Sequence, residues 1–107
     1  MTEIKQEIKD KLVLGLDVGD IDAAVKMVEL VGDYFAYAKV GSELFAQSGV
    51  EAITRLRDLG MKVFLDLKLH DIPNTVERAC EVHGSRGISL MTVHASGGKE
   101  MLEAAKR

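Results

Sequence analysis

The sequence predicts an α/β fold in which four strand–helix units follow a short N-terminal helix. Short apolar runs typical of buried strands recur along the chain, and each is followed by apolar residues at helical spacing. This alternation indicates parallel strands joined by right-handed crossovers. The chain has 107 residues, which is enough for one domain and too few for two.

The first predicted helix spans residues 2–10, where Ile4 and Ile8 lie four positions apart among charged residues. The run KLVLGLDV over residues 11–18 then predicts a strand that brings Asp17 to its carboxyl end. The helix that follows is indicated by four apolar residues at positions i, i+3, i+4 and i+7, namely Ile21, Ala24, Val25 and Val28.

Asp20 precedes this helix and is a candidate N-cap. The second strand is predicted over residues 34–41 (YFAYAKVG), with Lys39 close to its end. A helical stretch over residues 42–59 follows, and we expect an interruption near Gly49.

The run KVFLDL over residues 62–67 predicts the third strand. Pro73 lies just beyond it and suits the first turn of a helix, where a missing N–H is harmless. The run ISLMTVH over residues 88–94 predicts the fourth strand, which ends at His94. A last helix is expected from about Lys99.

Four such units fit either a small open α/β sheet or half of a (β/α)8 barrel, whose full form takes about 250 residues. Charged or ionisable side chains stand at the carboxyl end of every predicted strand: Asp17, Lys39, Asp66 with Lys68, and His94. Barrel enzymes gather catalytic groups at that rim, whereas open sheets bind ligands at one switch point. The pattern therefore favours half of a TIM-type barrel.

The third strand ends in the charged motif Asp66-x-Lys68-x-x-Asp71. Side chains two positions apart on a strand point the same way, so Asp66 and Lys68 are expected side by side, with Lys39 reaching Asp66 from the neighbouring strand. Opposite charges in contact keep each other ionised even when partly desolvated. The spacing alone also fits a purely structural network of ion pairs, and that alternative stays open.

Composition argues against several other classes of protein. The net charge of −3 does not suit a nucleic-acid partner, because phosphate binding requires a basic surface. No apolar run approaches the roughly 20 residues that span a membrane, and the charged first ten residues do not predict a signal peptide. A single cysteine, Cys80, fits the reducing cytoplasm. His70 beside Asp71 lacks a third ligand, so no metal site is expected.

Four segments of the chain resemble a known family. DLKLHDIPNTV (residues 66–76) is very similar to the signature of orotidine 5′-phosphate decarboxylases. LGLDV (14–18), AKVGSELF (38–45) and TVHASGGKEM (92–101) resemble the first, second and fourth strand segments of that family, in the same order. The Asp-x-Lys-x-x-Asp core also occurs in related sugar-phosphate lyases such as 3-keto-gulonate 6-phosphate decarboxylase, which resemble this chain less after Asp71.

The resemblance implies a carboxy-lyase of pyrimidine biosynthesis that converts orotidine 5′-phosphate to UMP and CO2 without a metal or organic cofactor. It implies that Lys68 protonates C6 of the pyrimidine and that Asp66 lies against the substrate carboxylate. Asp17 and Lys39 would hold ribose hydroxyls, with Lys39 also supporting Asp66. The remaining two residues, Asp71 and Thr75, would cross a dimer interface to the ribose of the neighbouring subunit's substrate.

The family's barrel has eight strands, so residues 1–107 are expected to form a single partial domain, the N-terminal half of a barrel. The main phosphate-binding loops of such barrels follow strands seven and eight, so we expect this chain to be inactive by itself. Its open sheet edges predict a homodimer or a larger self-association. A non-catalytic half barrel, whose property is folding and assembly, is therefore the alternative to an enzyme.

Overall fold

The computed structural model describes residues 5–107, so the part of the first predicted helix that contains Ile4 lies outside the described residues. The elements are, in chain order, α1 (Gln6–Lys9), β1 (Val13–Gly15), α2 (Ile21–Val31), η1 (Gly32–Tyr34), β2 (Tyr37–Gly41), α3 (Ser42–Ser48), α4 (Val50–Asp58), β3 (Lys62–Leu69), α5 (Pro73–Ser85), β4 (Leu90–Val93), η2 (Ala95–Gly97) and α6 (Lys99–Lys106). The predicted alternation of strands and helices is confirmed.

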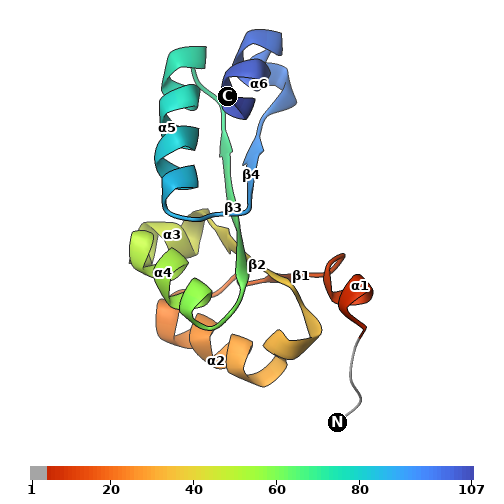
Figure 1. Ribbon diagram of the computed structural model, residues 1–107. Coiled ribbons are helices and arrows are strands. Elements are labelled where there is room, and N and C mark those ends of the chain that lie inside the picture. Colours follow the sequence, from red (N-terminus) through yellow and green to blue (C-terminus); the bar gives the residue numbers. More distant parts are fainter. Residues whose placement is uncertain (1–4) are drawn as a thin grey trace.

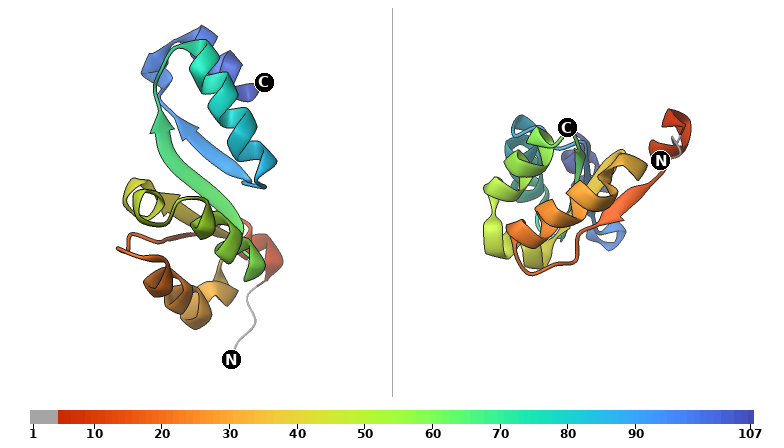
Figure 2. Two further views of the ribbon diagram at one scale, coloured as in Figure 1. Left: turned by 90° about the vertical axis from the view of Figure 1, so that its left-hand side faces the viewer. Right: turned by 90° about the horizontal axis from the view of Figure 1, so that it is seen from below.

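The four strands form one parallel sheet in the order β1-β2-β3-β4 (Figure 1). Consecutive strands are neighbours throughout, which is the arrangement of a β/α barrel and differs from the order reversal of a doubly wound open sheet. The long strand β3 pairs with β2 along its first part and with β4 further on, so it joins the α2–α4 side of the molecule to the α5–α6 side (Figures 1 and 2).

One face of the sheet is packed against helices. Side chains that alternate along β2 and β3 are fully buried there and form the main core together with residues of α2, α3 and α4; the strand members are Ala38, Val40, Val63 and Leu65. The packing follows from the period-2 geometry of strands and the apolar stripes of the helices. A second, smaller set of buried residues, Val76, Met101 and Ala104, lies on α5 and α6, which pack together.

The other face of the sheet carries the charged strand ends. Parallel register pairs Gly15 with Lys39, Lys39 with Phe64, and Gly41 with Asp66, so these side-chain positions point to the same side. We call this side the site face. It is opposite to the helix-packed core, as the inner surface of a barrel is.

Several local predictions are confirmed. The side chain of Asp20 accepts a hydrogen bond of 2.8 Å from the Ala23 N–H and caps α2. Gly49 separates α3 from α4 with φ = +57°, a conformation that few other residues adopt. Pro73 opens α5 at its first turn.

The ends of all four strands differ from the prediction, and β4 covers only Leu90–Val93 of the predicted residues 88–94. β1 stops at Gly15, so Asp17 lies beyond the strand, and Tyr34 belongs to the turn η1, which closes with a hydrogen bond from Phe35 N–H to Gly32 C=O. β3 continues to Leu69 because Leu69 pairs with Val93 after an irregularity. Apolar runs indicate which residues pack inside, but hydrogen-bond partners decide where a strand ends.

Candidate active site at the carboxyl ends of β2, β3 and β4

Asp66 is the centre of the candidate site. Among residues 5–107 it is the one charged residue that is buried, with 7% of its surface exposed. It lies on β3 between the central strand β2 and the strand β4, which removes its carboxylate from most of the water. A carboxylate in that position needs partners, because burying an unpaired charge costs several kcal/mol.

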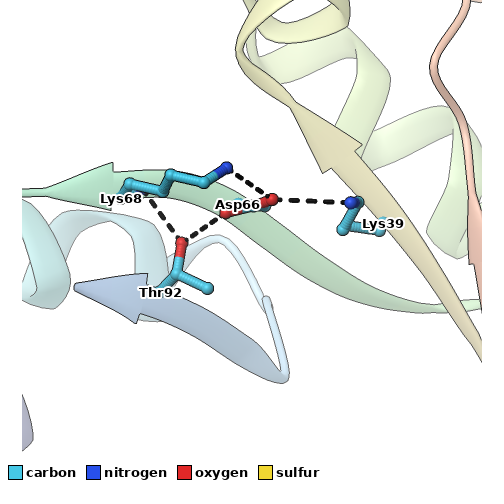
Figure 3. A network of polar contacts seen from close by, with 4 residues as sticks. All are labelled: Lys39, Asp66, Lys68 and Thr92. Atoms are coloured by element: carbon cyan, nitrogen blue, oxygen red, sulfur yellow. Dashed lines mark hydrogen bonds and ion pairs between the residues drawn. The ribbon is translucent and has the colours of Figure 1, made fainter. Parts of the chain in front are cut away.

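Three side chains provide those partners (Figure 3). Lys68 Nζ lies 2.9 Å from Asp66 Oδ2, and Lys39 Nζ of β2 lies 3.5 Å from the same oxygen. The hydroxyl of Thr92 on β4 donates a hydrogen bond of 2.7 Å to Oδ1. The predicted contact of Asp66 with both lysines is therefore confirmed.

These contacts keep Asp66 ionised. The Thr92 hydrogen bond and the Lys68 hydrogen bond hold the pKa of the Asp66 carboxyl below its ordinary value, and the charges of Lys68 and Lys39 act in the same direction. Burial opposes them but is outweighed. The Lys68 side chain is 62% exposed, so its ammonium is anchored to a buried anion while remaining reachable from the site face.

The backbone at Lys68 differs from the regular strand that the sequence predicted. Lys68 has φ = +52°, and it is the only residue other than glycine with positive φ among the described residues. Such a conformation costs about 1–2 kcal/mol for a side chain with a Cβ. Strict alternation therefore does not explain why Asp66 and Lys68 meet; an irregular stretch of β3 brings them together.

Asp17 lies on the same face of the sheet although it stands beyond the end of β1. A Cβ at Gly41 would be 3.8 Å from Asp17 Oδ1, and a Cβ at Gly15 would be 3.7 Å from Oδ2. The Asp17 carboxylate therefore lies over two glycines that point to the site face. It is exposed, and it adds a second carboxylate to the site face.

Asp71 and Thr75 lie elsewhere. Asp71 is exposed in the loop before α5, where its carboxylate accepts a 2.7 Å hydrogen bond from the Ile72 N–H. Thr75 is exposed in the first turn of α5. Within the described chain, neither side chain makes a hydrogen bond or ion pair with the Asp66 cluster. The structure thus brings together Lys39, Asp66 and Lys68. It leaves Asp71 and Thr75 apart from them.

Two histidines stand side by side at the same end of the sheet. The rings of His70, after β3, and His94, after β4, have centroids 5.2 Å apart at an angle of 35°. His94, at the end of the fourth predicted strand, thus lies at the rim, as expected. The residues from 5 onward contain no group of three or more side chains that would hold a metal ion.

Sequence reasoning did not single out Thr92. It contacts both Asp66 and the backbone N–H of Lys68, from which its hydroxyl accepts a 3.0 Å hydrogen bond. A signal was available, because Thr92 is a hydroxyl residue inside an apolar strand that neighbours β3. What the sequence did not show was the register that places it opposite Asp66.

The fold and the site define a class of protein: a parallel β/α barrel whose reactive groups stand at the carboxyl ends of its strands, represented here by four of its units. Residues 10–107 match the pattern of one family of this class, described as "Orotidine 5'-phosphate decarboxylase / HUMPS family". The chain belongs to the orotidine 5′-phosphate decarboxylase / HUMPS family.

Individual relatives belong to the same family. The chain is 48% identical over 98 residues to the orotidine 5′-phosphate decarboxylase of Carboxydothermus hydrogenoformans, covering 92% of this chain and 41% of that protein. It is 46% identical over 99 residues to the one from Heliobacterium modesticaldum, again covering 92% and 41%. The chain therefore spans about 41% of the length of these curated relatives.

Solved structures show the same partial coverage. The crystal structure of orotidine 5′-phosphate decarboxylase from Lactobacillus acidophilus superposes with a TM-score of 0.80 at 41% identity, over 89% of this chain and 43% of that one. The enzyme from Methanocaldococcus jannaschii, solved with the inhibitor BMP, gives 0.83 at 35% identity, over 92% and 46%. The described residues thus have the fold of about half of such a barrel, as predicted.

No helix in the described part of the chain is both long and apolar enough to cross a membrane.

Proposed function

We propose that this chain carries the proton-donating half of an orotidine 5′-phosphate decarboxylase, a carboxy-lyase that converts orotidine 5′-phosphate to UMP and CO2. The observation that carries the proposal is the Lys39–Asp66–Lys68 cluster, in which one buried carboxylate oxygen lies 2.9 Å and 3.5 Å from two ammonium groups. Family membership and the inhibitor complex of the M. jannaschii relative support it. The names of the curated relatives favour this substrate over 3-keto-gulonate 6-phosphate.

The proposed reaction requires stabilisation of a carbanion. The bond between C6 and the carboxylate breaks, CO2 leaves, and the electron pair stays on C6 of the pyrimidine. An ammonium held beside that carbon stabilises the developing negative charge more than it stabilises the bound substrate. The Lys68 ammonium then gives its proton to C6, and Asp66, 2.9 Å from the Lys68 Nζ, holds Lys68 in position.

The other site residues are assigned to substrate binding. Lys39 and Asp17 bind the ribose hydroxyls, which is supported by the position of both side chains on the site face. Asp71 and Thr75 reach the ribose bound to a neighbouring subunit. Their exposure and their separation from the Asp66 cluster support a role across an interface.

A chain that spans about 41% of its relatives lacks more than half of their residues, and barrel enzymes bind phosphate mainly through the loops after strands seven and eight. We therefore expect no measurable turnover from the 107-residue chain alone. Binding energy from the phosphate drives catalysis at the distant ring, so its loss lowers the rate as well as the affinity.

The decisive experiment mixes the purified chain with the missing C-terminal part of the C. hydrogenoformans relative and measures the loss of orotidine 5′-phosphate. Decarboxylation should appear in the mixture and be absent from either part. Lys68→Ala should abolish it, whereas Lys62→Ala, at the opposite end of β3, should not. Turnover that survives Lys68→Ala would reject the proposed role of this lysine.

The proposed partners are the nucleotide substrate and a second copy of the chain, and neither nucleic acid nor a membrane is among them. Cytoplasmic location fits the proposed pathway, which supplies UMP, and the single thiol of Cys80. An assembly that forms in the mixing experiment without any decarboxylation would favour the alternative of a non-catalytic half barrel.

A further inference from the structure

Thr92 lies where the pairing between β3 and β4 is irregular. Leu65 pairs with Met91 and Leu69 pairs with Val93, so three residues of β3 stand opposite one residue of β4. Those three are Asp66, Leu67 and Lys68, and the one is Thr92. An insertion of this kind redirects side chains and backbone groups away from the regular ladder.

The hydroxyl of Thr92 is shared by two groups of this inserted stretch. The Lys68 backbone N–H lies 3.0 Å from Thr92 Oγ1 and can only donate, so the hydroxyl oxygen accepts there. Asp66 Oδ1 lies 2.7 Å from the same oxygen and, as a carboxylate, can only accept. The single hydroxyl proton is therefore committed to Asp66, and the direction of both hydrogen bonds is fixed.

This arrangement divides the Asp66 carboxylate between two sets of partners. Oδ1 is occupied by Thr92, which leaves Oδ2 for the ammonium groups of Lys68 and Lys39 (Figure 3). The same hydroxyl holds the N–H of Lys68, the residue with φ = +52°. One side chain thus constrains both the carboxylate that receives the Lys68 amine and the backbone from which that amine extends.

We propose that Thr92 is a positioning residue that aims the Lys68 amine by tying the Asp66 carboxylate to the Lys68 backbone. Its part in catalysis rests on the proposed decarboxylation, in which Lys68 delivers the proton. The contacts themselves do not depend on that reaction. If Thr92 only filled space in the sheet, a side chain of the same size without a hydroxyl would serve equally well.

Valine and serine test this distinction. Thr92→Val keeps the shape and removes the hydroxyl, whereas Thr92→Ser keeps the hydroxyl and removes a methyl group. In the folded chain we would follow the Asp66 carboxyl carbon by NMR as the pH is lowered, and hydrogen exchange of the Lys68 amide. The charged groups in contact with Asp66 are Lys39 on β2 and Lys68 on β3, and the Asp17 carboxylate lies over Gly41, which pairs with Asp66; all three residues stay unchanged.

Thr92→Val should raise the Asp66 pKa towards the ordinary aspartate value, because the strongest of the interactions that lower it is removed. The Lys68 amide should exchange faster, since it loses its acceptor. Thr92→Ser should leave both close to wild type. A folded Thr92→Val chain with unchanged Asp66 titration and unchanged Lys68 exchange would overturn the proposal.

Two further measurements keep the test decisive. If Thr92→Val does not fold, Thr92→Ala is compared with Thr92→Ser in the same way, and rapid exchange of the Lys68 amide in the unmodified chain would by itself refute the proposal. In the mixture with the C-terminal part, Thr92→Val should lower kcat by roughly 10- to 100-fold with little change in KM, and serine should restore it. If the NMR results for the Thr92 variants are as expected but the mixture shows no turnover, the proposed function is rejected and the positioning role is retained.

Discussion

At the scale of single residues, the buried carboxylate of Asp66 determines what the site can do. A carboxylate with 7% exposure would tend to take up a proton, yet its three partners keep its pKa below the ordinary value, with Thr92 contributing most, then Lys68. The negative charge is thereby retained, and it holds an exposed ammonium in place. Burial and charge are compatible here only because each carboxylate oxygen has a partner.

The lowered pKa makes folding depend on pH. The unfolded chain protonates Asp66 at a higher pH than the folded chain, so stability from this group is complete above about pH 4 and is lost as the pH falls through the lower folded value. The free energy of unfolding, measured in urea at pH 7 and pH 3, should fall less for Asp66→Asn than for wild type. Asp58→Asn, an exposed control at the end of α4, should behave like wild type.

The positive φ of Lys68 gives a second prediction. Lys68→Ala and Lys68→Gly both remove the amine, but only glycine adopts φ = +52° without strain. The glycine variant should therefore be more stable than the alanine variant by about 1 kcal/mol in chemical denaturation. In a regular strand the order would be reversed, so a more stable alanine variant would contradict the strained backbone.

Much of the site could be predicted from the sequence because charged residues at strand ends are conspicuous. The contact of Asp66 with Lys39 follows from adjacent parallel strands, which the alternation of elements already implied. The contact with Lys68 was expected from the two-residue spacing, but in the structure it depends on the irregular backbone of β3. Thr92 could not be found in this way, since its contact depends on an irregular register between β3 and β4. A hydroxyl in an apolar strand marks a polar position, but its partner cannot be assigned until its neighbour across the sheet is known.

At the scale of elements, the sequence indicated every α-helix and strand among the described residues, but not the short helical turns η1 and η2 or where the strands end. Helix starts carry local chemistry, such as the Asp20 cap and Pro73, so they can be read from a few residues. Strand ends depend on partners far along the chain. The role of a glycine likewise depends on the backbone conformation at its position, which the sequence alone does not give.

Two glycines near the end of α5 should respond oppositely to alanine. Gly84 lies inside the helix, and a Cβ added there would meet open space, so Gly84→Ala should stabilise the fold by about 0.5–1 kcal/mol. Gly87 has φ = +82°, and the Arg57 guanidinium lies where its Cβ would be. Gly87→Ala should therefore destabilise by about 1–3 kcal/mol. Thermal unfolding of the two variants measures the difference, and equal effects would contradict these backbone assignments.

At the scale of the whole molecule, the described chain is elongated, with extents of 47 × 30 × 22 Å. β3 connects the core beneath β1 and β2 to the smaller cluster on α5 and α6 (Figure 1). The outer strands β1 and β4 each pair on one side only, which leaves backbone donors and acceptors unpaired along two edges. A closed barrel has no such edges.

These edges lead to a prediction about assembly. Leu90 on β4 is 44% exposed, and a hollow of about 290 Å³ lies beside it, lined also by Cys80 and Met91. We expect the chain to sediment as a dimer or larger species at high protein concentration, because pairing along β4 would satisfy the edge and cover the exposed Leu90 side chain.

Leu90→Lys places a charge on that edge and should shift the chain towards monomer, since a buried lysine without a partner is unfavourable. Leu30→Lys, at a residue of α2 that is 78% exposed and lies away from the sheet edges, is the matched control and should leave the sedimentation unchanged. Adding the C-terminal part of a relative should compete with self-association, because both would use the same strand edges. A wild-type chain that stays a single monomeric species at all concentrations would show that the open edges are protected by other means.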